Sequence, residues 1–162
     1  MGTSVQWVVF GLDTTRVAVP LTVVERIVRA AEVTPLPLAP GMVIGVVNVA
    51  GCVLPVLNVR RKFRLPERVV GPDDHFLIAQ TSRGSIVLVI DVAYGVLEQP
   101  AVAIETAFAA DKGSEHIGGA LVSQDGLVLV HDLNRFLSPD DAQQLDEALR
   151  LEDARRNPAH AP

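Results

Sequence analysis

The side chains that could support metal binding or catalysis in this sequence are four histidines and a number of serines and acids. His75, His116, His131 and His160 lack the H-E-x-x-H spacing that turns two imidazoles toward one zinc ion. His116 and His131 could meet across a hairpin and bind a metal together with Asp132, whereas ordinary strand histidines are the simpler interpretation. We therefore expect no metal site.

The other reactive side chains also fail to form a catalytic pattern. No serine lies in a G-x-S-x-G motif, and the glycines near 113–119 are not followed by the G-K-[ST] of a phosphate-binding loop. The adjacent acids at 73–74 and 140–141 suit a loop or a helix cap better than two carboxylates converging on a substrate. The sequence indicates a binding module without a cofactor. A small β-barrel enzyme or ligand carrier stays open as an alternative.

Composition and charge restrict the class of partner. The formal net charge is −5, aromatic residues make up 4% of the chain, and no basic run exceeds residues 60–62. Nucleic-acid binding requires a basic surface and aromatic side chains for stacking, so we expect no nucleic-acid partner. The longest apolar stretch, 43–57, is interrupted by Asn48, Gly51 and Pro55 and is too short to span a bilayer. We expect no direct membrane insertion.

Cysteine usage and the N-terminal residues indicate the compartment. Cys52 is the only cysteine, so no internal disulfide can form and a reducing compartment is expected. We expect Cys52 to act as a small buried apolar residue. No basic segment followed by an apolar one opens the chain, so no signal peptide is recognised. These features predict a cytoplasmic protein.

The segment 45–60 is the most informative stretch for the fold. Its many valines favour strands, because β-branched side chains suit a pleated and half-buried surface. Gly51 can adopt a positive φ, so the segment is predicted to be a hairpin that bends at Ala50 and Gly51. The prolines of 34–40 exclude a helix before it and predict an extended lead-in.

Alternating apolar residues and turn signals predict further strands on either side of this hairpin. A short helical turn is expected at 21–23, another short helix at 60–65, and an exposed loop at 66–74. Ser138 and Pro139 begin a helix, since serine is a good N-cap and proline suits the first helical position. Ala142, Leu145 and Leu149 give that helix an apolar stripe. The expected strands are 5–12, 16–19, 24–30, the two arms of the 45–60 hairpin, 75–80, 85–90, 92–97, 116–123 and 127–132.

The two halves of the chain repeat one pattern of hairpin, corner, connector and hairpin. The segment from Gly51 to Arg60 has a counterpart from Gly126 to Arg135, and each ends with a polar residue and an arginine. We interpret this as a divergent internal duplication that yields two small β-barrels side by side. The first barrel is expected from about 5–65 and the second from about 75–137, followed by a C-terminal helix at 138–156.

An ordered set of motifs resembles the CheW family of chemotaxis coupling proteins. The match runs over roughly residues 5–145 without large gaps. In the second half, I-V-L-V-I-D at 86–91 is similar to the family's V-G-L-V-V-D, and I-G-G at 117–119, Gly126 and D-L at 132–133 to its closing I-x-G…L-D-L. In the first half, the matching motifs are V-V-F at 8–10, A-V-P-L at 18–21, V-x-x-I-V-R at 24–29, T-P-L-P at 34–37, G-V-V-N at 45–48, Gly51, L-P-V at 54–56 and Arg60.

The resemblance implies a fold, a role and a set of partners. The fold would be mainly β, with two five-stranded SH3-like barrels in a single CheW-like domain over 1–162, together with short helices and a C-terminal helix. Proteins of this family are non-catalytic scaffolds without a cofactor. They connect the cytoplasmic helical tip of methyl-accepting chemoreceptors to the regulatory domain of the histidine kinase CheA. An apolar groove between two barrels suits the apolar face of such a helix pair.

The resemblance also implies which residues contact partners. The family binds receptors with first-barrel residues around the groove between the barrels. In this chain the matching positions for receptor contact include Val24, Ile27, Asn48 and Val49. The complete predicted contact set consists of Val24, Arg26, Ile27, Gly45, Asn48, Val49, Ala50 and Arg60.

Three positions depart from the family's pattern. The family usually has an acid at Arg26, an arginine at Ala50 and an aspartate at Asn58. If positions 26 and 50 face each other on neighbouring strands, the usual opposite charges would attract, and this chain lacks that pair. An exposed pair contributes only about 0–1 kcal/mol, so the fold should tolerate the change, while a reversed charge at an interface can alter partner choice.

Two roles remain open for a protein of this kind. The first is a scaffold that couples receptor and kinase in a chemosensory complex. Its changed charges either indicate a dedicated receptor or kinase, or a non-flagellar array, in place of a general-purpose coupler, or are neutral. The second is a CheW-like adaptor that binds receptors without activating the kinase. Binding to the receptor without a rise in kinase activity would distinguish the second role.

Overall fold

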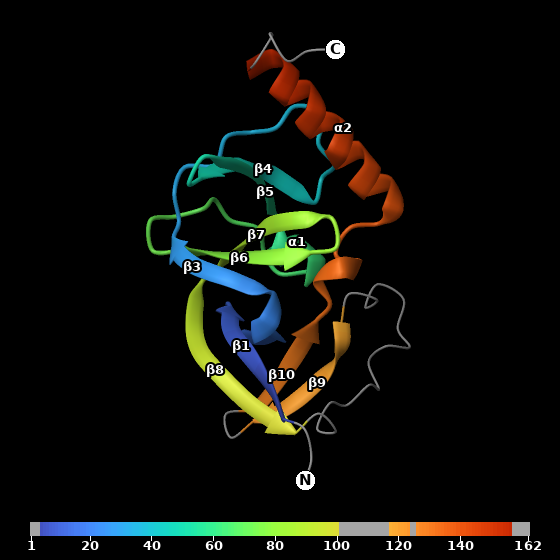
Figure 1. The fold of residues 1–162 in the computed structure, drawn as a ribbon. Helices are drawn as coiled ribbons and strands as arrows, with labels where there is room; N and C mark the ends of the chain where they lie inside the picture. Colours follow the sequence, from blue (N-terminus) through green and yellow to red (C-terminus); the bar gives the residue numbers. More distant parts are fainter. Residues whose placement is uncertain (1–3, 101–116, 124–125, 157–162) are drawn as a thin grey trace.

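The computed structural model describes residues 4–100, 117–123 and 126–156. Within them the chain forms ten strands, two α-helices and two short 3₁₀ turns, and the C-terminal helix is the longest element (Figure 1). The elements are β1 (Ser4–Leu12), β2 (Thr15–Pro20), a 3₁₀ turn (Leu21–Val23), β3 (Val24–Arg29), β4 (Val43–Val49), β5 (Cys52–Leu57), α1 (Val59–Lys62), β6 (His75–Thr81), β7 (Gly84–Ile90), β8 (Val92–Pro100), β9 (Ile117–Ser123), β10 (Gly126–His131), a second 3₁₀ turn (Leu133–Arg135) and α2 (Pro139–Arg156).

The strands form two five-stranded sheets. Sheet A has the order β8-β1-β2-β10-β9, and sheet B has the order β3-β6-β7-β5-β4. In Figure 1, sheet A lies below sheet B, and α2 lies at the upper right beside sheet B. The mainly β class and the C-terminal helix were predicted correctly, whereas closure of each sheet into a barrel stays a prediction.

The predicted division of strands between the two units is wrong. Strands β1 and β2, which were expected in the first unit, belong to sheet A together with β8, β9 and β10. Strands β6 and β7 join β3, β4 and β5 in sheet B instead. Each half of the chain therefore gives its leading hairpin to the other half's sheet, because β3 and β8 both cross over after the hairpin that precedes them.

Both sheets nevertheless share one pairing scheme, in agreement with the predicted repeat. Each contains an antiparallel hairpin, β1–β2 or β6–β7, and each hairpin is flanked by the crossing strand of the other half. The second strand of each hairpin, β2 or β7, pairs in parallel with a strand of another hairpin in the same sheet. β2 pairs with β10 and β7 with β5, as in Val17↔Leu129 and Val87↔Val56. The two sheets therefore have the same strand order and strand directions, because the two halves of the chain contain the same elements in the same order.

Three apolar clusters hold these layers together. One cluster, which includes Trp7 and Val128, lies on one face of sheet A, and another, which includes Phe76 and Val56, lies on one face of sheet B. The largest cluster joins the opposite faces of both sheets to α2 and contains Phe10, Leu88 and Leu145 among its members. The protein is thus stabilised by a shared central core as well as by a core in each sheet.

Helix α2 packs on this central core by one side. The Ser138 hydroxyl accepts a hydrogen bond from the Asp141 amide at 3.1 Å, which is the N-cap that the sequence predicted. Ala142, Leu145 and Ala148 are buried, while Leu149 is only half-buried. The apolar stripe is therefore rotated slightly from the predicted one, which leaves the Leu149 side chain beside a pocket described below.

The β4–β5 hairpin bends where it was predicted to bend. Ala50 and Gly51 have φ values of 51° and 88°, which gives the turn two consecutive left-handed residues. The expected burial of Cys52 is wrong, since the residue is exposed. Cys52 is the first residue after the turn, where the hairpin extends beyond the apolar cores, so no side chain covers its thiol.

Candidate protein-binding surface

Six of the predicted contact residues lie in two groups at opposite edges of sheet B. Val24, Arg26 and Ile27 are on edge strand β3, and residues 48–50 end β4 and enter the hairpin turn. Arg26 is exposed and Val24 and Ile27 are half-buried, so the β3 group offers both apolar surface and a positive charge. The 48–50 group is exposed except for the half-buried Val49.

Both groups nevertheless lie at the same end of sheet B. Strand β3 begins beside the last part of β6, where Val24 pairs with Ala79, and the β6–β7 turn at 82–83 follows directly. Strands β5 and β7 run parallel, so the β4–β5 turn at 50–51 precedes β5 at that same end. The strand directions therefore place the predicted groups on either side of the β6–β7 turn.

The expected charge pairing between positions 26 and 50 does not fit the sheet. Arg26 pairs with Ile78 of β6, and β3 and β4 are separated by three strands in the order of sheet B. The two positions therefore do not face each other on neighbouring strands. The reason is the crossing connection, which places β3 next to β6 rather than next to the hairpin that follows it in sequence.

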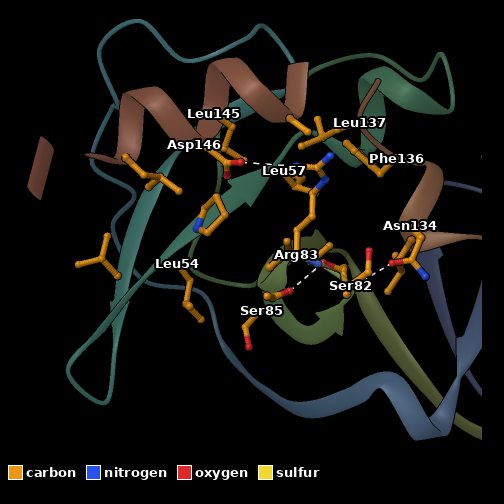
Figure 2. Close-up of a pocket in the computed structure, with 18 residues that line it drawn as sticks. Leu54, Leu57, Ser82, Arg83, Ser85, Asn134, Phe136, Leu137, Leu145 and Asp146 are labelled. Atoms are coloured by element: carbon orange, nitrogen blue, oxygen red, sulfur yellow. Dashed lines mark hydrogen bonds and ion pairs between the residues drawn. The ribbon is translucent and has the colours of Figure 1, made fainter. Parts of the chain in front are cut away.

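An apolar pocket of about 260 Å³ lies between the two groups in the strand order (Figure 2). Its walls come from β5, from the β6–β7 turn and from α2, with Leu54 and Leu57 on the first and Leu145 and Leu149 on the last. Phe136, which is 1% exposed, forms part of its inner surface. None of the predicted contact residues lines this pocket. Its walls come from three segments that are distant in sequence, so no local motif predicts it.

Polar side chains surround the mouth of this pocket. The Arg83 guanidinium reaches from the β6–β7 turn toward Asp146 on α2, with 3.5 Å between Nη1 and Oδ2 (Figure 2). Both side chains remain well exposed, at 58% and 61%. A hydrogen bond holds the β6–β7 turn in place, in which the Ser82 amide donates to Asn134 Oδ1 at 2.9 Å. The pocket therefore combines an apolar interior with one positive and one negative side chain at its edge.

A second pocket, of about 210 Å³, lies between the two sheets. It is lined by residues of both, among them Trp7 and Val130 from sheet A and Val23 and Gln80 from the sheet B side. The sequence predicted a groove between the two units, and this is its nearest equivalent. The predicted residues do not line it, although Val23 directly precedes Val24.

The other two predicted contact residues, Gly45 and Arg60, are buried. Gly45 lies under the extended lead-in, where Thr34 exchanges backbone hydrogen bonds of 2.9 and 2.7 Å with Val46. A Cβ atom at position 45 would lie 2.2 Å from the Thr34 carbonyl oxygen. A glycine is needed here because the backbone of Thr34 occupies the space of a side chain.

The Arg60 side chain connects three segments of the chain through ion pairs. Its guanidinium donates to both carboxylate oxygens of Asp13 at 3.0 and 2.9 Å, and to both oxygens of Asp91 at 2.7 and 2.8 Å. Asp13 belongs to the β1–β2 turn of sheet A, and Asp91 stands between β7 and β8. Arg68 pairs with Asp91 and with the buried Asp74. Any effect of Arg60 on partner binding would therefore be exerted through the fold.

The pKa values of Arg60 and Asp91 are shifted by this cluster. The Asp13 carboxylate raises the pKa of the Arg60 guanidinium above its ordinary value, against the opposing effect of burial. Burial alone would raise the pKa of Asp91. Hydrogen bonds from the Asp13 amide, Arg60 and Arg68 outweigh burial and hold the pKa of Asp91 below its ordinary value of about 3.8. Arg60 and Asp91 are therefore both charged at neutral pH.

Two asparagines serve the local backbone. Asn58 Oδ1 accepts from the Arg61 amide at 3.1 Å and caps α1, and Asn58 Nδ2 donates to Glu67 at 2.6 Å. An aspartate at this position would supply the first contact but not the second. Asn48 Oδ1 accepts from the Gly51 amide at 3.0 Å and supports the hairpin turn. The change at Asn58 thus has a structural explanation.

Among the described residues, the histidines do not form a reactive site. His131 is 1% exposed and packs its ring against Phe63 and Phe136, with centroids 5.3 and 5.5 Å apart. His116 and His160 lie outside the described residues, so the suggested pairing of His116 with His131 lies outside them too. In the described ranges, no group of three or more histidine, cysteine or acidic side chains is arranged to hold a metal ion.

The described surface therefore offers apolar pockets with charged edges, carried on two sheets. Among the described residues, none of the helices has the length and apolar character to cross a bilayer. These features define a mainly β protein built on two five-stranded sheets. Comparison with known proteins identifies the family.

The family model of the CheW-like domain matches residues 6–140. The chemotaxis protein CheW of Treponema pallidum is 25% identical over 146 residues, covering 86% of this chain and 86% of that protein. Protein FrzA of Myxococcus xanthus is 29% identical over 126 residues, covering 77% and 79%. The crystal structure of the scaffolding protein TtCheW from Thermoanaerobacter tengcongensis has the same fold, with a TM-score of 0.76, 18% identity, and coverage of 87% of this chain and 92% of that one.

The chain belongs to the CheW-like family. Its place is among the chemotaxis scaffold and coupling proteins, and it is not an enzyme.

Proposed function

We propose that this protein couples methyl-accepting chemoreceptors to the regulatory domain of a CheA-type histidine kinase. It would do so as a cytoplasmic adaptor that is recruited to receptor arrays. The proposal rests on membership of the CheW-like family over residues 6–140. The single structural observation that supports it is the gathering of Val24, Arg26, Ile27 and residues 48–50 at one end of sheet B.

The proposed contact surface consists of the exposed and half-buried members of the predicted set. Val24 and Ile27 supply apolar area next to the charge of Arg26, and residues 48–50 supply the rigid hairpin turn at the other edge. A protein interface of this type needs an apolar centre with polar side chains around it. Gly45 and Arg60 lie toward the other end of sheet B and would affect this surface only through the fold.

Isothermal titration tests the proposal. The purified chain is titrated with the kinase regulatory domain and, separately, with the receptor tip, both from the same genome. We expect micromolar binding to each partner, and we expect Val24→Asp to weaken the binding of the receptor tip by about tenfold or more, since it places a charge in an apolar contact. Thr22→Asp, at an exposed position just before β3, is the matched control and should bind like the unmodified chain.

The two unusual residues allow a sharper test of partner choice. Arg26→Glu together with Ala50→Arg restores the charges usual in the family. If the changed charges select a dedicated partner, the double variant should lose affinity for the partners of its own genome by several-fold. Unchanged affinity would show that these two positions have drifted on a solvated face.

The second candidate function is that of an adaptor that binds receptors without activating the kinase. It predicts tight binding of the receptor tip with no gain in kinase activity when all three proteins are mixed. Binding to neither partner would contradict coupling altogether. A small molecule retained through purification would then favour the ligand carrier.

A further inference from the structure

The pocket between β5, the β6–β7 turn and α2 has the dimensions of a site for a compact ligand. Its volume of about 260 Å³ lies just below the roughly 300–1,000 Å³ that is usual for drug-sized molecules. It exceeds the roughly 150 Å³ of an engineered apolar cavity that takes up benzene. A ligand with one branched or aromatic hydrocarbon group and a small polar head matches this volume.

The inner surface of the pocket and its walls differ in exposure. Leu57 and Phe136 lie on the inner surface and are each 1% exposed, because the chain's own core covers most of both side chains. Leu54, Leu137 and Leu149 are half-buried and retain apolar surface that a ligand would cover. The elements around the pocket already pack on one another, so the space accepts a group the size of one side chain and not a further helix or strand. Burial of such a group favours binding.

Opposite charges lie at the mouth of the pocket on two different elements. Arg83 is on the β6–β7 turn and Asp146 is on α2, with 3.5 Å between Nη1 and Oδ2 (Figure 2). Within the described residues neither side chain makes another ion pair, and the two are 58% and 61% exposed. An exposed pair of this kind contributes little to stability, so a ligand that offers each member a better partner separates them at small cost.

A free α-amino acid supplies both partners from one carbon atom. Its carboxylate accepts two parallel hydrogen bonds from a guanidinium such as that of Arg83, and its ammonium donates to a carboxylate such as that of Asp146. Its side chain extends from the same carbon atom and would enter the apolar interior. A hydrocarbon would leave both charges of the pocket unused, and an acid or an amine alone would use only one of them.

We propose that this pocket binds a free apolar α-amino acid, such as leucine or phenylalanine, with its carboxylate on Arg83, its ammonium on Asp146 and its side chain among the leucines of the wall. A bound ligand would connect the β6–β7 turn to α2 in place of a weak direct ion pair. The inference goes beyond the proposed function and does not rest on it, since the pocket shares no residue with the predicted contact set.

Isothermal titration of the unmodified chain with analogues of one ligand tests the assignment of the polar groups. We expect L-leucine and L-phenylalanine to bind and to raise the thermal midpoint of unfolding. N-acetyl-L-leucine lacks the ammonium and L-leucinamide lacks the carboxylate, so each should bind about tenfold more weakly than leucine. Glycine lacks the apolar group and should not bind measurably.

Two variants assign each charge of the ligand to its partner. In Asp146→Asn, leucine should lose its advantage over isocaproate, which has the same hydrocarbon chain without the amino group. In Arg83→Gln, leucine should lose its advantage over leucinamide. A merely structural role of the ion pair would weaken all these ligands alike in both variants. Glu147→Gln is the matched control on α2, because Glu147 is exposed and lies outside the pocket.

A second pair of variants tests the apolar part. Leu149→Ala removes part of the pocket wall, whereas Leu151→Ala makes the same change on the same helix outside the pocket, at a side chain that is 52% exposed. We expect only the first to weaken the binding of leucine, by about tenfold.

The possible outcomes are distinct. Equal binding of leucine, N-acetylleucine and leucinamide would overturn the amino-acid assignment, because the two charges would then play no part. No binding of leucine or phenylalanine at millimolar concentrations would overturn the site itself. Neither result affects the coupling proposal, which is tested separately with the kinase regulatory domain and the receptor tip.

Discussion

The backbone of Thr34 decides which residue position 45 can hold. In Gly45→Ala the new Cβ would meet the Thr34 carbonyl oxygen at 2.2 Å and its carbon at 2.8 Å. Backbone atoms cannot rotate away as a side chain can, so the lead-in must move and its bridge to Val46 must break. We expect a loss of about 1–3 kcal/mol in the free energy of unfolding, measured by urea denaturation.

Gly71→Ala is the matched control for this substitution. Its new Cβ would have Asp74 Oδ2 as its nearest neighbour, at the ordinary contact distance of 3.8 Å. We expect a change within about 0.5 kcal/mol. Equal losses in the two variants would mean that the lead-in does not restrict position 45.

The lowered pKa of Asp91 predicts how stability depends on pH. A carboxyl group with a lower pKa in the folded state stabilises the protein above its unfolded pKa, and this contribution disappears as the pH falls through the folded pKa. Asp91→Asn should therefore be less stable than the unmodified chain at pH 7, by about 1–3 kcal/mol. The difference should stay constant down to about pH 5 and shrink below about pH 4.

Urea denaturation at a series of pH values measures this difference. Asp73→Asn is a suitable control, because Asp73 is exposed and makes none of the described contacts with Arg60 or Arg68. A constant difference between Asp91→Asn and the unmodified chain down to pH 3 would contradict the ionic role of Asp91.

At the scale of elements, Asn58 joins the cap of α1 to the loop that follows. Asn58→Asp would keep the cap but replace the donor to Glu67 with a second carboxylate at hydrogen-bonding distance. We expect a loss of about 1 kcal/mol at pH 7, because a hydrogen bond is exchanged for like-charge repulsion. The loss should diminish as salt is added, because salt screens the repulsion between the two carboxylates.

Asn58→Ser is the comparison that isolates the repulsion. Serine also caps a helix, and it removes the contact with Glu67 without adding a charge. Its effect should be smaller than that of Asn58→Asp at pH 7 and independent of salt concentration. A salt-independent loss in Asn58→Asp would contradict the explanation by repulsion.

Individual elements were largely predictable from sequence because their signals are local. The valine-rich runs, the Ala50-Gly51 bend and the Ser138-Pro139 helix start all depend on neighbours within a few residues. The exposure of Cys52 was not predictable in this way, since it depends on how far the hairpin extends beyond the cores. The pocket beside α2 could not be predicted from local signals either, because its walls come from three distant segments.

At the scale of the whole molecule, Arg60 links the two sheets through Asp13 and Asp91. In Arg60→Gln the two aspartates would lose their main cation, which should cost about 3 kcal/mol. The unfolding of the sheets should also become less coupled. Trp7, the only tryptophan, is 5% exposed in sheet A and reports on that sheet, whereas α2 reports on the side of sheet B.

Tryptophan fluorescence and helical circular dichroism measure the two parts during urea denaturation. We expect coincident transitions for the unmodified chain and separated transitions for Arg60→Gln. Arg61→Gln is the control, since Arg61 is exposed and, within the described residues, its side chain donates a hydrogen bond to the Gly41 carbonyl and not to either aspartate. Coincident transitions in Arg60→Gln would show that the apolar core alone couples the sheets.

The sequence contained the repeat but not the exchange of hairpins between halves. Each strand's pattern is satisfied equally well by either sheet, because both present apolar faces of similar composition. The choice depends on which crossing strand pairs with which hairpin, as in Gly11↔Val92 and Val24↔Ala79. That is a property of long-range packing. The role of Arg60 as an internal tie follows from this exchange and could not be seen without it.

The same exchange determines the order in which the protein can be completed during synthesis. The β1–β2 hairpin emerges first, yet its partner β8 is made about 80 residues later, since Gly11 pairs with Val92. At ribosomal rates this is a delay on the order of ten seconds, during which the apolar faces and the unpaired edge of the hairpin stay uncovered. An isolated two-stranded hairpin of this kind is barely stable in water. The nascent chain therefore passes through a long interval in which chaperones, or a neighbouring copy at the same stage, can reach strands that the finished protein conceals.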